Sequence, residues 1–297
     1  MTRKLRVKRQ YRELGVALFY LSPAVLGFLV FFLGPSLYAL YMSFHNWTLL
    51  SPPRWIGLAN YQRLLFGDEM FWVVVKNTFY YAALSIPLSV ISGFLSGLLL
   101  RRQSKLVGFY RTTYLIPYVA PMVAVAFVFK CLYAEQTGIL NHILSLLSLR
   151  PIPWLTDPKY AMPSVVAMGV WKGLGFGMVV FLTGLQAIPQ EFYEAAEIDG
   201  AGRWALTRHI TIPLLMPTMF FFVVIQIIGA FQVFAQVQIM TGGGPWYSTQ
   251  VYTLEMYNHA FKSFRMGYAS AMAYILTVIM VSLTVVARKT IGRDVSL

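Results

Sequence analysis

Long runs of apolar residues, separated by short polar and basic segments, dominate the chain. A helix that crosses a bilayer needs about 20 residues of this kind. Membrane helices tolerate the prolines inside these runs, because neighbouring helices can bond the freed backbone groups. The pattern therefore predicts an all-α membrane protein with six transmembrane helices. The predicted spans are about 16–44, 71–100, 114–133, 163–185, 212–240 and 268–287.

The composition agrees with this pattern. Of the 297 residues, 58% are hydrophobic and only 12% are charged. A soluble domain carries about 25% charged residues, so a soluble domain this apolar could not cover its surface. We expect one transmembrane domain over residues 16–290. A basic N-terminal segment, 1–15, and a short tail, 291–297, flank this domain and are expected to be cytoplasmic.

The basic residues indicate the orientation. The formal net charge is +13, but the bases lie at the ends of apolar runs instead of alternating with aromatic residues, which argues against a nucleic-acid partner. More than half of the 24 lysines and arginines fall in four alternate segments, 1–15, 101–111, 203–208 and 288–293. Cytoplasmic loops collect such residues, so both termini are predicted to be cytoplasmic. The first apolar run is too long for the core of a signal peptide and is expected to be retained.

Few residues offer reactive or metal-binding chemistry. Cys131 is the only cysteine, so no internal disulfide can form. The four histidines are scattered singly and have no metal-ligand spacing, so we predict no metal site.

A polar segment at about 187–209 separates the fourth and fifth spans and carries a short predicted helix. Pro189 suits a helix start, and Glu191 and Glu194 favour the positive end of the helix dipole. Ala195 and Ala196 are small helix formers, and the sequence 199–202, Asp-Gly-Ala-Gly, ends the helix. Small residues before a glycine break allow another protein to come close. An amphipathic connector on the membrane surface is the alternative interpretation.

This segment resembles the EAA loop of ATP-binding-cassette (ABC) importer permeases. The pattern of that loop is Glu-Ala-Ala, three residues, Gly, nine residues and Ile-x-Leu-Pro. The chain has Glu194-Ala195-Ala196, Gly200 and, nine residues later, Ile210-Thr211-Ile212-Pro213. The one departure is Ile212, which replaces the usual leucine. In such permeases this loop binds a groove on the ATPase subunit. The resemblance gives that role to Glu194, Ala195, Ala196, Asp199, Gly200, Gly202 and Pro213.

The resemblance extends from about residue 19 to 273 and is strongest to the carbohydrate branch, of the maltose or glycerol-phosphate kind. The turn Gly242-Gly243-Gly244-Pro245 after the fifth span is fairly specific for this branch. The resemblance implies a MetI-like fold of type I importers in the bacterial inner membrane. It also implies that the chain forms half of a translocation pathway for a sugar-like solute. The implied partners are a second homologous permease, two cytoplasmic ATPases, an external solute-binding protein and the lipid bilayer.

The chain is not expected to be an enzyme. Its glycine-rich turn at 242–245 lacks the Gly-Lys-Ser/Thr ending that places a lysine on phosphates. ATP and magnesium are therefore expected in the partner ATPase, and no cofactor is expected in this chain.

Polar residues in the fifth span are candidates for the pathway. If the span is one helix, Gln226, Gly229, Gln232, Val233 and Gln236 fall within an arc of roughly 120°. Amides can donate to and accept from sugar hydroxyls, which favours a polar lumen. Hydrogen bonding between helices is the alternative role for such residues.

The fourth span offers a second candidate set, formed by Trp171, Lys172 and Phe176. Aromatic side chains can stack on sugar rings. A charge within a span is costly unless it faces water or a partner, so Lys172 lines the pathway or extends along apolar surface toward the outer face.

Two other function classes compete with the importer. An ion-coupled secondary transporter needs carriers for protons or sodium, yet acidic residues are nearly absent from the spans. An intramembrane enzyme needs a reactive set at one depth, and no His-Asp, Cys-His or Ser-Lys set is evident.

Overall fold

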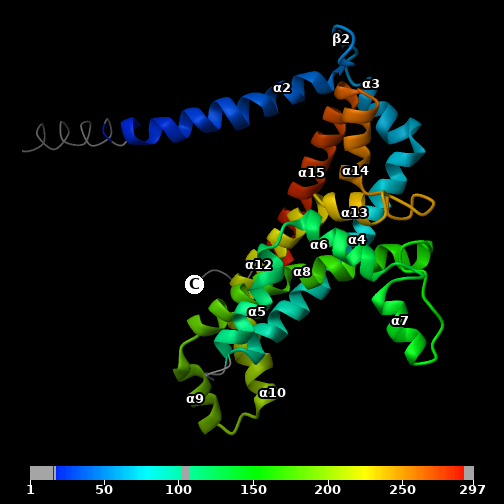
Figure 1. The fold of residues 1–297 in the computed structure, drawn as a ribbon. Coiled ribbons are helices and arrows are strands. Elements are labelled where there is room, and N and C mark those ends of the chain that lie inside the picture. The colour runs from blue at the N-terminus through cyan, green and yellow to red at the C-terminus, as the bar shows by residue number, and fades with distance from the viewer. Residues whose placement is uncertain (1–15, 17, 102–106, 291–297) are drawn as a thin grey trace, which may run out of the picture. The chain divides into compact units, whose positions relative to one another are not determined.

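The computed structural model describes residues 16, 18–101 and 107–290 (Figure 1). The predicted cytoplasmic segments 1–15 and 291–297 lie outside the described residues. The chain divides into two compact units, which are described separately. Of the described residues, those up to 64 and those at 259–274 form the first unit, and those at 65–258 and from 275 onward form the second.

The first unit is built on a long N-terminal helix, Leu18–Ser43, that contains one π-helical turn. Two antiparallel strands of two residues each follow, and they are the only strands among the described residues of an otherwise helical fold. The Asn60 side-chain amide donates to the carbonyls of Ser43 (2.8 Å) and His45 (2.9 Å), which fixes the chain after the helix. The elements that begin in this unit are η1 (Leu29–Leu33), α2 (Gly34–Ser43), β1 (His45–Asn46), β2 (Arg54–Trp55), α3 (Ala59–Gln62), η2 (Arg63–Gly67) and α15 (Met266–Thr290).

The second unit is built on two long helices, α4 (Glu69–Leu99) and α8 (Pro158–Ala187). Each begins at an aspartate cap: Asp68 accepts from the backbone of Phe71, and Asp157 accepts from that of Lys159. The other elements that begin in this unit are α5 (Val107–Val119), α6 (Met122–Leu132), α7 (Ile139–Leu146), α9 (Gln190–Ile198), α10 (Arg203–Leu206), η3 (Thr207–Thr211), α11 (Ile212–Leu214), α12 (Met216–Phe231), α13 (Ala235–Met240), α14 (Tyr252–Tyr257) and η4 (Asn258–Lys262).

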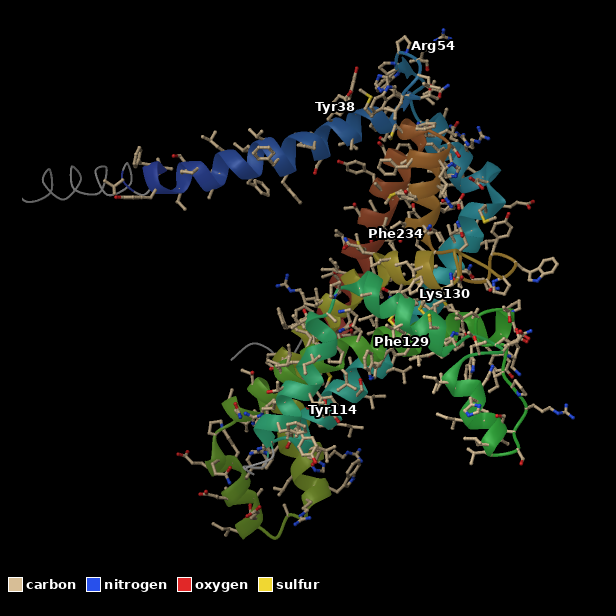
Figure 2. The ribbon with its side chains drawn as sticks, viewed as in Figure 1. Tyr38, Arg54, Tyr114, Phe129, Lys130 and Phe234 are labelled. Carbon is tan, nitrogen blue, oxygen red and sulfur yellow. The ribbon has the colours of Figure 1, made fainter. Side chains whose placement is uncertain are left out.

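Glycines let the helices of the second unit approach closely. A Cβ atom added at Gly93 of α4 would lie 3.0 Å from the Cα of Gly177 on α8. A Cβ added at Gly175 would lie 2.2 Å from the carbonyl oxygen of Tyr114, on α5 (labelled in Figure 2). The backbones of α4 and α5 thus both contact α8, a close packing that small residues allow in membranes.

The described residues contain four helices long and apolar enough to cross a membrane, or up to six if each of two bent helix pairs is one span. The first pair is α5 and α6, which differ in direction by 97°, and the second is Arg203–Leu214 and α12, which differ by 65°. Both bends lie at prolines, Pro121 and Pro217, which lack the N–H that a continuous helix needs. With each bent pair taken as one span, the count reaches the six that the sequence predicts, and two of those spans are broken.

Candidate coupling loop and transport pathway

The predicted loop helix is present as α9 (Gln190–Ile198), with Pro189 at its N-cap. Gly200 follows with a φ of +83°, the left-handed conformation that favours glycine. The amide of Gly200 donates to the carbonyl of Glu197 (3.0 Å), and that of Ala201 donates to the carbonyl of Ala196 (2.9 Å). This pair of bonds is a Schellman cap, so Gly200 ends the helix as the sequence predicted.

The residues assigned to ATPase binding lie on the surface of the loop. Glu194, Ala195, Asp199, Gly200, Gly202 and Pro213 are exposed, and Ala196 is half-buried. Three large apolar side chains beside them are also exposed: Phe192 (51%), Ile198 (87%) and Trp204 (73%). We refer to these three residues as the exposed apolar residues of the loop. They are candidate positions for contact with another protein.

Tyr193 fixes α9 to the rest of the second unit. It is only 6% exposed and packs with Leu185, Ile188 and Leu215, at the ends of α8 and α11. Its hydroxyl shares a hydrogen bond with Thr211 (3.1 Å), and the guanidinium of Arg101, just after α4, lies 4.4 Å from the centre of its ring. Three helix ends therefore meet at one side chain.

The sequence analysis did not identify Tyr193. Phe192 and Tyr193 are adjacent aromatic residues, and the pattern alone did not indicate which one is buried. A cavity of about 720 Å³ opens beside Tyr193, lined among others by Arg101, Gln190, Glu197 and Arg203. The loop thus combines a buried anchor, Tyr193, with exposed apolar residues.

The candidates on α8 take different positions. Trp171 is 45% exposed, and its ring lies 5.1 Å from that of Phe129 on α6 (labelled in Figure 2). Phe176 is half-buried and stacks on Tyr118, with ring centres 5.3 Å apart. Lys172 is 8% exposed and donates to the carbonyls of Pro117 (3.2 Å) and Tyr118 (2.8 Å). The lysine therefore does not extend along apolar surface toward water.

The amide arc of the fifth span is wrong as a continuous helical face. Helix α12 ends at Phe231, and α13 begins at Ala235, so a non-helical segment separates Gln226 from Gln236. Phe234, with φ −141° and ψ −67°, is not helical, and the turn of 100° per residue cannot be carried across it.

The arc residues also differ in burial. Gln236 is 7% exposed and donates to the hydroxyl of Tyr81 on α4 (2.7 Å), which matches the alternative role of bonding between helices. Val233 is buried, Gln226 is half-buried, and Gly229 and Gln232 are exposed. Only the exposed and half-buried members can face a solute.

A loop between α13 and α14 carries the glycine-rich turn. Asn77 of α4 donates to the carbonyls of Tyr247 (2.7 Å) and Gln250 (2.9 Å), and Thr249 donates to that of Gly244 (2.6 Å). The side-chain amide of Asn77 thus ties the loop to α4. Among the described residues, no group of three or more metal-ligating side chains is close enough to hold an ion.

Comparison with known proteins identifies the family. Residues 85–290 match the model of the binding-protein-dependent transport system inner membrane component. The chain belongs to this family. It is therefore a multi-pass permease component of an ABC importer in the inner membrane, and such components are not the ATPase and are not expected to hold a cofactor. Membership excludes the ion-coupled carrier and the intramembrane enzyme.

Relatives that match most of the chain support the same family assignment. A probable ABC transporter permease protein, YesP of Bacillus subtilis, is 35% identical over 91% of this chain and 88% of its own length. The trehalose/maltose transport system permease protein MalF of Thermococcus litoralis is 34% identical over 99% of both chains.

The fold agrees with a solved transporter. A chain of a bacterial alginate ABC transporter, solved in complex with an alginate-pentasaccharide-bound periplasmic protein, matches with a TM-score of 0.84. The match covers 98% of both chains at 24% sequence identity, so it establishes the fold of the permease. The MetI-like fold implied by the EAA loop is thus confirmed.

Proposed function

We propose that this permease forms half of the translocation pathway for a sugar-like solute. A second homologous permease supplies the other half, two cytoplasmic ATPases drive the cycle, and an external binding protein delivers the solute. The relatives named for trehalose/maltose and alginate transport support the carbohydrate class. Residues 16–290 form the transmembrane domain, with a coupling loop at about 187–209 and cytoplasmic segments at 1–15 and 291–297.

The arrangement of α9 carries the coupling part of the proposal. Phe192 and Ile198 on α9 and Trp204 on α10 are exposed, while Tyr193 on the same loop is buried against the ends of three helices. A force applied to the exposed residues therefore reaches α4, α8 and α11 through one side chain. Glu194, Ala195, Ala196, Asp199, Gly200, Gly202 and Pro213 complete the contact surface.

The positive-inside distribution supports the orientation of the proposal. The coupling loop contains Arg203 and Arg208, and the segment after α4 begins with Arg101. Both lie on the side that the base distribution assigns to the cytoplasm, where the ATPases bind.

Five exposed or half-buried candidates remain as pathway residues: Trp171 and Phe176 on α8, and Gln226, Gly229 and Gln232 on and after α12. Of these, Gly229 allows close approach of a solute to α12. Aromatic rings stack on sugar rings, and amides bond to sugar hydroxyls. Val233 and Gln236 are buried in the unit and are not proposed to contact the solute.

The proposal is tested on the assembled transporter with Gly200→Leu and Gly200→Asn. Leucine is strained at the left-handed backbone of this position, whereas asparagine adopts it more readily. We expect Gly200→Leu to insert normally, to lose co-purifying ATPase and to abolish ATP-dependent uptake, and Gly200→Asn to retain part of both. Undiminished uptake by Gly200→Leu at normal protein level would refute the coupling role.

A further inference from the structure

The break between α5 and α6 leaves a backbone carbonyl without its helical partner. In a continuous helix the carbonyl of Pro117 would accept from the N–H of residue 121, but Pro121 has none. Helix α5 ends at Val119, and α6 leaves it at 97°. A bilayer core offers no water to pair an open backbone group, so a break here needs another donor.

Lys172 supplies that donor from a different helix. Its ammonium donates to the carbonyls of Pro117 (3.2 Å) and Tyr118 (2.8 Å), and it lies 5.7 Å from the centre of the Tyr118 ring. The last carbonyls of a helix carry partial negative charge, which a cation stabilises. The lysine is 8% exposed, so water does not take over this role.

Contacts on both sides of Lys172 hold α8 where the lysine ammonium reaches the carbonyls of Pro117 and Tyr118. Gly175, one turn further along, contacts the backbone of Tyr114 on α5, and Trp171 packs on Phe129 of α6. The lysine thus lies between the contacts of α8 with the two halves of the broken span. Its position is set by the packing of α8 against both helices.

We propose that Lys172 is a tethered cation that closes the C-terminal end of α5 at the helix break. In ion-coupled carriers the carbonyl ends of broken membrane helices bind sodium or a proton. Here the chain's own ammonium takes that position, so the bent span is stable without a co-transported ion. Lys172 is then a positioning residue for the pathway surface formed by Trp171 and Phe176, and it is not itself a solute ligand.

The first experiment compares Lys172→Met with Lys159→Met in the purified transporter. Both lysines lie on α8, but Lys159 is exposed at the start of the helix. We expect Lys172→Met to lower the melting temperature and the recovered amount of the complex, and Lys159→Met to change neither. Equal behaviour of the two variants would overturn the proposal.

A double-mutant cycle separates the backbone role from simple packing. Pro121→Ala restores a backbone N–H at the position where the helix lacks one. If Lys172 replaces that donor, Lys172→Met will cost less in the Pro121→Ala background than in the parent. If the Lys172→Met transporter does not accumulate in the membrane, the double variant should restore its amount, and that recovery would support the same role. An equal loss in both backgrounds, or no recovery, would contradict the role.

The charge is tested by adding a cation to Lys172→Ala. Ethylammonium chloride should raise the melting temperature of this variant more than choline chloride at the same concentration, because choline is too bulky for the space left by the side chain. Lys159→Ala serves as the control and should respond equally to both salts. Equal responses of Lys172→Ala to the two salts would refute a cation site. None of these measurements depends on ATPase coupling. A negative result would therefore overturn the role of Lys172 and leave the proposed function unaffected.

Discussion

The side-chain amide of Gln236 donates to the hydroxyl of Tyr81 across 155 residues of sequence, at 2.7 Å and with both side chains buried. The bond joins α13 to α4 directly before the glycine-rich loop. It gives Gln236 the second of the two roles that the sequence left open, bonding between helices. A buried pair of this kind stabilises the fold as long as both partners are present.

We expect Gln236→Leu to destabilise the transporter without changing its apparent solute affinity. The Tyr81 hydroxyl would be left unpaired, at a cost of about 1–3 kcal/mol. Tyr81→Phe should cost a similar amount, and the double variant should lose less than the sum, because no polar group is then left unpaired. Melting temperature and concentration-dependent uptake measure the two effects. A weaker solute affinity at normal stability would return Gln236 to the pathway.

Gln232, in contrast, is exposed where α12 ends and keeps a pathway role. Gln232→Leu should remove one hydrogen bond to the solute, about 0.5–1.5 kcal/mol, which is a few-fold loss of transport affinity. The amount of assembled transporter should stay normal. A fall in purified yield together with activity would instead assign Gln232 to the contact between permeases, and wild-type uptake at normal yield would remove it from both roles.

Two glycines on α8 form a matched pair for the helix packing. Gly175→Ala places a Cβ 2.2 Å from the Tyr114 carbonyl, whereas an added Cβ at Gly173 meets no atom within 4 Å. Overpacking should cost Gly175→Ala about 1–3 kcal/mol. Gly173→Ala should be neutral or gain up to about 1 kcal/mol, because alanine favours a helix. Thermal unfolding of the purified complex checks both, and equal stabilities would contradict the close approach of α5 and α8.

Asn141 organises the loop between α6 and α8 with four hydrogen bonds. Its amide donates to the carbonyls of Glu135 and Ile152 (both 2.9 Å), and its oxygen accepts from the Ile152 backbone (3.0 Å) and the Trp154 indole (2.9 Å). Asn141→Leu loses all four, at about 0.5–1.5 kcal/mol each. We expect rapid cleavage of this loop in limited proteolysis. His142→Ala, at the exposed neighbouring position, is the control and should resist cleavage like the parent.

The orientation is checked with reporter fusions. A reporter fused after Arg102 should report a cytoplasmic position, and one inserted within 242–247 should report an external position, because the base-rich segments stay inside. An enzyme pair that is active on opposite sides of the membrane gives complementary signals at the two sites. The reverse pattern would place the loop at 187–209 outside the cytoplasm and contradict its proposed contact with the ATPase.

The sequence by itself determined the membrane class and the short helix after the fourth span, because each rests on local patterns. Apolar run length and the helix-ending sequence at 199–202 are read from consecutive residues. The Gly200 cap is equally local, since its two hydrogen bonds join residues only a few positions apart. The long apolar helices, α9 and its cap agree with the structure for that reason. The orientation and the coupling role, which rest on the bases and on the spacing from Glu194 to Pro213, stay predictions.

Only the tertiary structure decided which polar groups in the spans face the protein interior. Lys172 bonds to carbonyls 54 and 55 residues away, and Gln236 bonds to a hydroxyl 155 residues away, so no local pattern contains their partners. The interruption after α12 likewise ended the helical register on which the amide arc depended. Burial of Tyr193 in place of Phe192 followed from the meeting of three helix ends. Local periodicity assigns a residue to a helix face, but packing decides what that face contacts.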